Sequence, residues 1–459
     1  MIPLSVEQLA DVVGGRVLDE PAAAPVREVV IDSRRVRPGS LFVALPGEHT
    51  DGHEFLADAA ARGAAACLVD ETRAIPEGVV AVTVDDPGDA LLGLGRWVRD
   101  TVDPAVVGIT GSVGKTSTKD LIATAAGAGR SVVANVGSYN NDLGVPLTCC
   151  RLEAGSEVLV AEVGARGVGH IASLADLLSP DIGVVTAIRG AHLELFGDVG
   201  TIAAAKGELV EALEPEGLAV LNADDPRVAA LAARTRARVV TYGVRAEADW
   251  QAESVTLDAV ARPTFRLRGR ELTLAIPGEH NVGNALAALA VADALGVQLD
   301  DAAAALADAR LSRWRMELVR TRGGITVLND AYNANPTSMS AALETLMRMD
   351  EGGRRWAVLG QMAELGPAEA EEHERLGRLA ARLGVDGLVA VGPLAGSIQE
   401  AADRAAPAGE RFAADDVDGA ITLLAERLLP GDVVLVKASR AAGLERVADA
   451  LVAMFEGPA

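Results

Sequence analysis

Lysine is scarce in this sequence. Only four of the 42 basic residues are lysines, at positions 115, 119, 206 and 437, and arginine supplies every other positive charge. The ammonium group of lysine is compact and can lose its proton when it is buried. The guanidinium of arginine is larger and planar, and it keeps its proton. Each of the four positions is therefore a candidate for a role that arginine cannot fill. The alternative is a coding bias toward arginine that spared four positions by chance, and for Lys119 the sequence leaves both explanations open.

Cysteine is equally rare, and long apolar runs are absent. Three cysteines, of which Cys149 and Cys150 are adjacent, make neither a disulfide framework nor a spaced zinc motif. The N-terminus has no basic segment followed by an apolar stretch, so no signal peptide is expected. The most apolar helix candidate, residues 282–299, is interrupted by polar side chains and predicts a core helix, not a membrane span. We therefore expect a cytoplasmic protein that does not insert into membranes.

Positive charge is in deficit, because the formal net charge is −23. Such a charge repels nucleic acid and anionic membrane surfaces, which excludes both as expected partners. It also disfavours small anionic ligands such as ATP. Their sites must therefore be built locally from glycine-rich loops, arginines and metal ions.

The length of 459 residues exceeds what one core supports, so several domains are expected, and we expect a monomer. Alternating strand-like and helix-like runs predict an α/β fold throughout. Residues 1–104 form a small α/β domain and end at Asp103-Pro104. Residues 105–310 form a central domain with a largely parallel sheet, and residues 311–459 form a second doubly wound, Rossmann-like sheet.

A strand, a glycine-rich loop, a lysine, a hydroxyl and a helix follow one another between residues 105 and 124. Two glycines let backbone N–H groups turn toward a triphosphate, a lysine reaches the outer phosphates, and a threonine hydroxyl can hold magnesium. Ile109 stands where the strict P-loop pattern has glycine, so this is a shortened variant. The predicted nucleotide-binding residues are Gly111, Ser112, Val113, Gly114, Lys115, Thr116 and Ser117.

Three further residues are candidates for the same site. Glu162 ends an apolar strand, so its carboxylate is either an ordinary surface acid or a ligand of magnesium held by Thr116. His192 follows another strand-like run and is either structural or a ligand. Lys206 is by default a surface lysine, although a buried lysine with a depressed pKa can react with carbon dioxide to form an anionic carbamate.

Polar residues also cluster where later strands end and helices begin. Asn281 and Asn284 are either helix caps or hydrogen-bond partners for a base such as adenine. Arg315 can reach a γ-phosphate only if two domains close. The polar run at residues 329–336 follows a buried strand and indicates a recognition loop.

Together these segments resemble the Mur ligase family, the ATP-dependent amide ligases that assemble the peptide of bacterial cell-wall precursors. The resemblance covers the whole chain. The motifs around Asp32-Ser33-Arg34, residues 38–45 and residues 51–55 are similar to the UDP-binding first domain of that family. The segments at residues 139–146, 329–336 and 360–366 are similar to the branch that adds D-alanyl-D-alanine to UDP-N-acetylmuramoyl-tripeptide.

The resemblance implies roles for individual residues. Lys206 would be carbamylated and, with Glu162 and His192, would help hold a second magnesium ion, while Thr116 holds the first. Asn281 would lie near the adenine, with Asn284 beside it, Arg315 at the γ-phosphate and Asp330 at the ribose. Lys115, Lys206, His192 and Arg315 would form the catalytic set. The residues implied for substrate binding are Ser33, Arg34, Asn140, Asn141, Asp142, Tyr332, Asn333, Asn335, Lys437, Ser439 and Arg440.

The implied function is therefore ATP-dependent amide formation through an acyl phosphate in peptidoglycan precursor synthesis. The main alternative within the family adds the third, diamino acid residue, but its typical Asp-Asn-Pro-Arg motif does not occur. A folylpolyglutamate synthase would lack the first hundred residues. A GTP-dependent switch is excluded because no lysine follows an asparagine, whereas a non-catalytic nucleotide-binding protein stays open.

Overall fold

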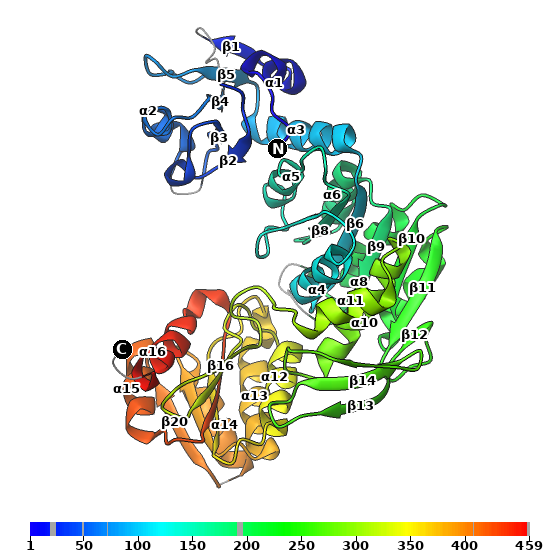
Figure 1. Ribbon diagram of the computed structural model, residues 1–459. Coiled ribbons are helices and arrows are strands. Elements are labelled where there is room, and N and C mark those ends of the chain that lie inside the picture. The colour runs from blue at the N-terminus through cyan, green and yellow to red at the C-terminus, as the bar shows by residue number, and fades with distance from the viewer. Residues whose placement is uncertain (19–23, 48–49, 71, 191–195, 407, 457–459) are drawn as a thin grey trace.

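The computed structural model in Figure 1 describes residues 1–18, 24–47, 50–70, 72–190, 196–406 and 408–456. These residues form three successive α/β blocks, and each block is built around its own main sheet. In Figure 1 the blocks follow one another from blue through green to red. The α/β class expected from the sequence is confirmed. Among the described helices, none is both long and apolar enough to cross a membrane.

The first block contains a five-stranded sheet in the order β1-β5-β4-β3-β2. Only β1 runs antiparallel to its neighbour, and the other pairs are parallel. Asp86 caps the helix that leads out of this block by accepting from the N–H groups of Gly88 and Asp89. The elements are α1 (Val6–Val13), β1 (Arg16–Leu18), β2 (Glu28–Val30), β3 (Ser40–Val43), α2 (Leu56–Ala61), β4 (Ala66–Asp70), β5 (Ala81–Val84) and α3 (Pro87–Val102).

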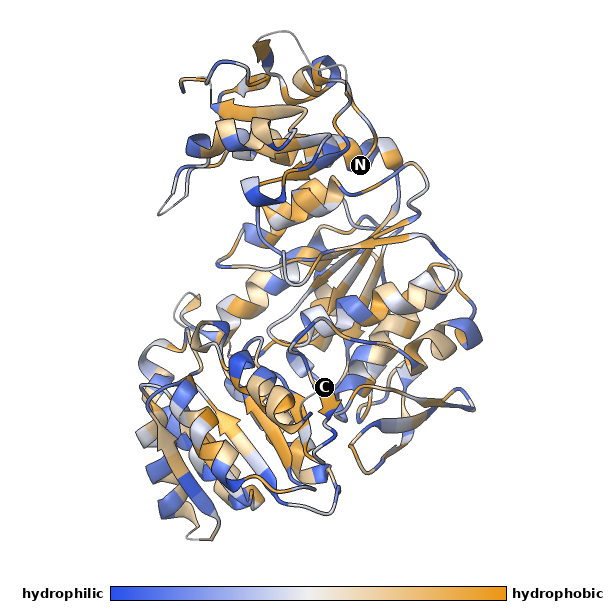
Figure 2. Ribbon diagram, turned by 60° about the vertical axis from the view of Figure 1, so that its left-hand side comes forward, coloured by the Kyte–Doolittle hydropathy of each residue, from blue (hydrophilic) through white to orange (hydrophobic). Residues whose placement is uncertain are grey.

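The second block is built on a seven-stranded parallel sheet in the order β12-β11-β10-β9-β6-β8-β7. Its central strands are buried on both faces, as their unbroken apolar runs predict, and Figure 2 colours these strands mainly as hydrophobic. The strands are β6 (Ala105–Thr110), β7 (Val132–Ala134), β8 (Val158–Glu162), β9 (Ile182–Val185), β10 (Leu218–Asn222), β11 (Arg238–Gly243) and β12 (Trp250–Gln251).

Helices and a small antiparallel sheet complete this block. Helix α10 packs on α4, the helix that begins at Lys115, and so lies close to the glycine-rich loop. The helices are α4 (Lys115–Gly127), α5 (Gly144–Cys149), α6 (His170–Leu178), α8 (Val199–Glu211), α9 (Pro226–Ala229), α10 (His280–Ala294) and α11 (Leu299–Ala307). The small sheet consists of β13 (Glu253–Leu257), β14 (Pro263–Leu267) and β15 (Arg270–Thr273).

The third block contains a six-stranded sheet in the order β16-β17-β21-β18-β19-β20, in which only β16 is antiparallel. The strands are β16 (Glu317–Arg320), β17 (Thr326–Asn329), β18 (Arg355–Leu359), β19 (Gly387–Val391), β20 (Glu410–Ala414) and β21 (Val433–Lys437). The helices are α12 (Pro336–Arg348), α13 (Glu369–Leu383), α14 (Ala395–Ala405), α15 (Val417–Arg427) and α16 (Glu445–Phe455).

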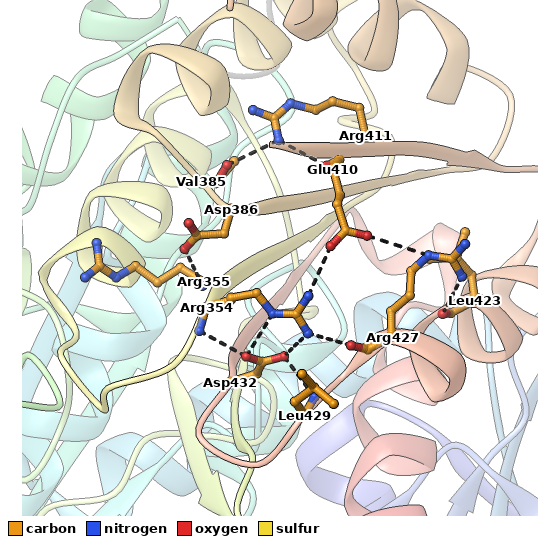
Figure 3. Close-up of polar contacts among 10 residues, drawn as sticks. All are labelled: Arg354, Arg355, Val385, Asp386, Glu410, Arg411, Leu423, Arg427, Leu429 and Asp432. Carbon is orange, nitrogen blue, oxygen red and sulfur yellow. Dashed lines mark hydrogen bonds and ion pairs between the residues drawn. The ribbon is translucent and has the colours of Figure 1, made fainter. Parts of the chain in front are cut away.

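Arg354 ties together the amino ends of three strands of the third sheet (Figure 3). Its guanidinium lies 2.8 Å from the Asp432 carboxylate and 3.0 Å from that of Glu410. Arg427 lies 3.8 Å from the other oxygen of Glu410 and extends the network. Arg354, Glu410 and Asp432 stand at or directly before the first residues of β18, β20 and β21. The network therefore lies at the amino ends of these strands, opposite to their carboxyl ends.

The alternation of strands and helices expected from the sequence occurs in all three blocks, but several short elements were not predicted. Strands β1, β7, β12, β16 and β20 lie at or next to sheet edges, and helix α1 lies at the N-terminus. Edge strands need only one pairing partner and bury less apolar surface, so their sequences carry a weaker pattern. Residues 282–299, predicted as one core helix, form most of α10, which ends at Ala294, and the turn that leads to α11.

Candidate active site

The second and third blocks share one large cavity of about 1440 Å³. The carboxyl ends of β6, β8 and β9 open into it from the second block, and those of β17 and β21 from the third. Ligands of open α/β sheets collect at such strand ends. Eighteen predicted site residues line the cavity, and the last six of them lie on the third block: Ser112, Val113, Gly114, Lys115, Thr116, Ser117, Asn140, Asn141, Asp142, Glu162, Lys206, Asn284, Arg315, Asp330, Tyr332, Asn333, Asn335 and Lys437.

The glycine-rich loop is held tightly against the end of β9. Gly111 and Gly114 adopt φ values of +151° and +82°, which other residues rarely adopt. The Thr186 hydroxyl donates to the Val113 carbonyl at 2.6 Å, and the Ser112 N–H donates to the Ala187 carbonyl at 2.7 Å. Lys115 Nζ donates to the Gly111 carbonyl at 2.9 Å and folds back over the loop. The loop therefore has the shape that surrounds a phosphate chain.

A side chain at Gly111 would collide with this anchor, because a Cβ atom there would lie 2.0 Å from Thr186 Oγ1. We expect Gly111→Ala to lower the free energy of unfolding by about 1–3 kcal/mol and to weaken ADP binding. Urea unfolding and calorimetric ADP titration measure the two effects. Gly127→Ala on α4 is the control, because its Cβ would meet nothing within 4 Å. Unchanged stability and ADP affinity in Gly111→Ala would contradict this account of the loop.

Glu162 is buried at the end of β8, and its carboxylate is oriented by neutral donors. The Thr116 hydroxyl donates to Oε2 at 2.6 Å, and the Asn140 amide donates to Oε1 at 2.6 Å. Asn135 Oδ1 accepts from the Glu162 backbone N–H at 2.6 Å. The carboxylate is thus fixed beside the hydroxyl that follows Lys115. The sequence alternative of an exposed surface acid is wrong, since Glu162 is 1% exposed.

Lys206 is also buried, and it lines the cavity. The alternative that it is a surface lysine is therefore wrong. The pKa of its ammonium is lowered to about 7: burial is the largest cause, the positive charge of Lys115 adds to the shift, and Glu208 and Glu162 oppose it. An amine with this pKa is partly neutral near pH 7. His192, the third predicted ligand, lies outside the described residues.

Lys115 and Arg315 approach each other across the cavity. Burial is the main cause that lowers the pKa of Lys115; Glu162 opposes the shift, and the charge of Arg315 adds to it. The Arg315 guanidinium stacks over the Tyr332 ring at 4.2 Å, and within the described part of the chain its buried Nε has no hydrogen-bond partner. The Tyr332 hydroxyl pairs with Ser138 on the second block. Two cations from different blocks therefore lie at one site.

Lys437 is buried on the third block and pairs with the candidate ribose ligand. Its Nζ lies 2.6 Å from Asp330 Oδ2 and 2.9 Å from the Asn333 carbonyl. Asp330 also accepts from the Met316 N–H at 3.1 Å. The ion pair fixes the polar run that follows β17.

The two candidate adenine ligands form a chain behind the loop. The Thr118 hydroxyl donates to Asn284 Oδ1 at 3.0 Å, Asn284 donates to Asn281 at 2.9 Å, and Asn281 donates to the Pro277 carbonyl at 2.8 Å. Only Asn284 lines the cavity, whereas Asn281 is fully buried behind it. Neither residue is the cap of α10, so the capping alternative is wrong.

Four predicted substrate residues do not line the cavity. Ser33 and Arg34 belong to the first block, where Arg34 is exposed and pairs with Asp32. The Ser439 hydroxyl is buried and accepts from the Ala363 N–H at 2.9 Å. Arg440 pairs with Glu445 and stacks over Trp314.

Asp224 lines the cavity, but it was not predicted as a site residue. Its carboxylate accepts from the N–H groups of Val244, Arg245 and Ala246 at 2.7–2.9 Å, which fixes the turn after β11 in the cavity wall. A signal was present in the sequence, because an acid pair, Asp224 and Asp225, begins two residues after the last residue of β10. Strand-end acids are common, however, and the sequence alone did not single this one out.

Comparison with known proteins gives the same relationship along the whole chain. A model of the Mur ligase middle domain matches residues 109–292, one of the Mur ligase glutamate ligase domain matches residues 314–440, and one of the Mur ligase family catalytic domain matches residues 25–91. The sequence is 44% identical to UDP-N-acetylmuramoyl-tripeptide–D-alanyl-D-alanine ligase of Mycobacterium tuberculosis, over 99% of this chain and 98% of that protein.

Solved structures agree with the sequence comparison. MurF from Acinetobacter baumannii superposes with a TM-score of 0.87 at 30% identity, over 98% of this chain and 99% of that one. MurF ligase from Thermotoga maritima in complex with ADP gives a TM-score of 0.81 at 30% identity, over 95% of this chain and 99% of that one.

Proposed function

This chain belongs to the Mur ligase family, and from that premise we propose that it joins D-alanyl-D-alanine to UDP-N-acetylmuramoyl-tripeptide in peptidoglycan precursor synthesis. The enzyme is an ATP-dependent amide ligase that forms ADP and phosphate. The observation that carries the proposal is the shared cavity, because a glycine-rich phosphate loop faces the polar run at residues 329–336 across it. The chain is similar over almost its full length to relatives that bear this activity in their names.

Each block has a part in this reaction. The first domain, residues 1–104, binds the UDP end of the peptide substrate with Ser33 and Arg34. The central domain, residues 105–310, binds ATP, and the C-terminal domain, residues 311–459, supplies Arg315 and the site of D-alanyl-D-alanine. The three main sheets, one in each domain, support these boundaries. We expect the enzyme to act as a monomer, and the cavity agrees with this expectation because residues of a single chain line both of its sides.

The oxygen donors at the loop suit magnesium. Thr116 offers a hydroxyl and Glu162 a buried carboxylate 2.6 Å away, and Mg²⁺ prefers such ligands together with phosphate oxygens. Thr116, Glu162, His192 and a carbamylated Lys206 would hold two magnesium ions. When bound, these ions neutralise charge on the phosphates. The carbamate forms when neutral Lys206 attacks carbon dioxide, an N–C bond is made, and one proton leaves to solvent.

The reaction proceeds by activation of a carboxylate. An oxygen of the terminal tripeptide carboxylate attacks the γ-phosphorus of ATP, an O–P bond forms, and the bond to the β,γ-bridging oxygen breaks to release ADP. Lys115 and Arg315 lie on opposite sides of the cavity and compensate charge on the transferring group. Since they come from different domains, the arrangement that brings them together also excludes water from the acyl phosphate.

Amide formation follows in the same enclosure. The amine of D-alanyl-D-alanine attacks the acyl carbon, a C–N bond forms, the C–O bond to phosphate breaks, and the amine loses a proton. Asn140, Asn141 and Asp142 on the central domain face Asn333 and Asn335 across the cavity and position the two peptide substrates. The ends of both substrates therefore meet between the two polar loops.

We expect phosphate release from ATP only when the UDP-tripeptide and D-alanyl-D-alanine are supplied together. The measurement offers each UDP-peptide with each amine in turn, and it includes tripeptides that end in diaminopimelate or in lysine. Because an amide cannot form without both partners, omission of either should leave only background hydrolysis. Equal phosphate release with a UDP-dipeptide and a free diamino acid would refute the proposal in favour of the preceding ligase.

A further inference from the structure

Lys119 is the one lysine of the four that was not predicted to belong to the site. It stands on α4, one turn after Lys115, and it is 2% exposed. Its Nζ donates to the carbonyls of Asn135 and Gly137, each at 2.9 Å, and lies 2.9 Å from Asp120 Oδ1. An ammonium group has three hydrogens, and here three acceptors surround it. A planar guanidinium does not match this compact arrangement, which explains why lysine stands here in a chain that otherwise uses arginine.

The two carbonyls belong to the segment at residues 135–143, which connects β7 to α5 and carries cavity residues. Asn135 is itself buried, and its side chain accepts from the Glu162 N–H at 2.6 Å and donates to the Tyr139 carbonyl at 2.5 Å. Further along the segment, Asn140 donates to the Glu162 carboxylate. The position of this segment therefore sets the orientation of both Asn140 and Glu162.

Asp120 connects the same lysine to the passage between domains. Its carboxylate accepts from the Ser312 N–H at 2.7 Å and from the Ser312 hydroxyl at 3.1 Å. Ser312 lies between α11 and β16, where the chain passes from the central to the C-terminal sheet. Arg315, which follows Ser312 by three positions in the chain, lines the cavity.

We propose that Lys119 is a positioning residue that holds the segment at residues 135–143 in its productive place, and that Asp120 links this place to the interdomain passage at Ser312. The link runs from Ser312 through Asp120 and Lys119 to Asn135 and Glu162. It meets the nucleotide site at Glu162, which accepts from the Thr116 hydroxyl, whereas the glycine-rich loop before Thr116 is held on the end of β9 by Thr186 and Ala187. A change at the passage is therefore transmitted to the peptide-binding segment without displacing the nucleotide. The inference rests on the proposed function, because the measured effect is on peptide ligation.

The test compares Lys119→Met, Asp120→Asn and Ser312→Ala with the wild type. Lys119→Met removes the three donors at nearly constant length, so kcat/KM for the UDP-tripeptide should fall by about 10- to 100-fold, since misplacement of binding groups is costly. Asp120→Asn keeps one acceptor oxygen and should lose about 3- to 10-fold. The ADP dissociation constant, measured by calorimetry, should stay within about threefold of the wild type in all variants.

Arg130→Met is the matched control. Arg130 follows the other end of α4, donates to the Leu295 carbonyl and pairs with Glu157 at 3.1 Å, so it too joins this region to two neighbours. It contacts neither the segment at residues 135–143 nor Ser312 in the described structure, and kcat/KM should stay within about twofold of the wild type.

The coupling of Lys119 to Ser312 gives a second readout. Within the described residues Lys119 and Ser312 are joined through Asp120, so the effects of Lys119→Met and Ser312→Ala on kcat/KM should be non-additive if the link operates. Additive effects, or wild-type kinetics in folded Lys119→Met, would overturn the proposal. The proposal would also be overturned if Lys119→Met lost as much affinity for ADP as it loses in kcat/KM for the UDP-tripeptide, because α4 as a whole would then have moved. If Lys119→Met does not fold, wild-type kinetics in Asp120→Asn overturns it instead.

Failure of this inference is distinguishable from failure of the proposed function. If the wild type itself releases no phosphate with UDP-tripeptide and D-alanyl-D-alanine, the proposed function is wrong. If the wild type is active and the variants behave as Arg130→Met does, only the positioning role is wrong.

Discussion

Lys206→Ala is expected to lose at least about 100-fold in turnover, because removal of an anionic group that holds a catalytic ion leaves charge on the phosphates uncompensated. Added acetate or formate should restore part of the activity, since a small carboxylate fits the space that the shortened side chain leaves. Steady-state phosphate release with and without these anions measures both effects. The expectation depends on the burial of Lys206, because an exposed lysine stays protonated and does not take up carbon dioxide.

The sign of the pH dependence follows from the same residue. With a pKa of about 7, the Lys206 amine is mainly neutral above pH 7 and mainly protonated below it. Carbamylation requires the neutral form. Wild-type activity in buffer with little carbon dioxide should therefore fall as the pH drops through 7, and added bicarbonate should restore it most effectively above that pH. Labelled bicarbonate should also give a carbamate resonance in carbon NMR spectra.

Lys206→Arg is the matched control for this prediction. A guanidinium fills the space, stays positive and forms no stable carbamate, so acetate should not rescue that variant. Full activity of Lys206→Ala in carbon-dioxide-depleted buffer would show that Lys206 has only a structural role. Equal rescue of Lys206→Ala and Lys206→Arg by acetate would also contradict the prediction, because the anion would then act elsewhere.

Lys115→Ala is expected to fold normally and to lose at least about 100-fold in turnover, since a preorganised positive charge at the transferring group is removed. The side chain lies over a loop, and among the described residues its hydrogen bond goes to the Gly111 carbonyl, so the core is not disturbed. Thermal unfolding checks the fold, and phosphate release with saturating substrates measures turnover.

Lys115→Met separates charge from bulk in the same experiment. It keeps the length of the side chain without the ammonium and should be as inactive as Lys115→Ala. Near-normal turnover in either folded variant would remove Lys115 from the mechanism. An activity in Lys115→Met well above that of Lys115→Ala would mean that packing contributes more than charge.

The parts of the site that were predictable from sequence are those encoded locally. The glycine-rich loop lies in one stretch between a buried strand and a helix, and its geometry follows from Gly111 and Gly114 themselves. Glu162 was recognisable because it ends an unbroken apolar strand, and parallel strands bring their carboxyl ends together. The order of the strands in each sheet was not predicted, but the largely parallel arrangement of the strands followed from the alternating strand-like and helix-like runs.

What the sequence did not encode locally was missed or left open. The burial of Lys119 depends on the segment that follows β7, an edge strand whose three residues gave no clear pattern. The position of Asn281 behind Asn284 depends on how α10 packs on α4, which no pattern along α10 alone specifies. Asp224 was missed because its partners lie 20 or more residues further along the chain.

The location of the lysines has a consequence for chemical labelling of this protein. Lys119, Lys206 and Lys437 are only 2–4% exposed, and Lys115 lies within the cavity. Almost no ε-amine is therefore presented at the outer surface of the described structure, so reagents that couple to lysine should react slowly with the folded protein. A reagent that acylates Lys115, Lys206 or Lys437 must be small enough to enter the cavity.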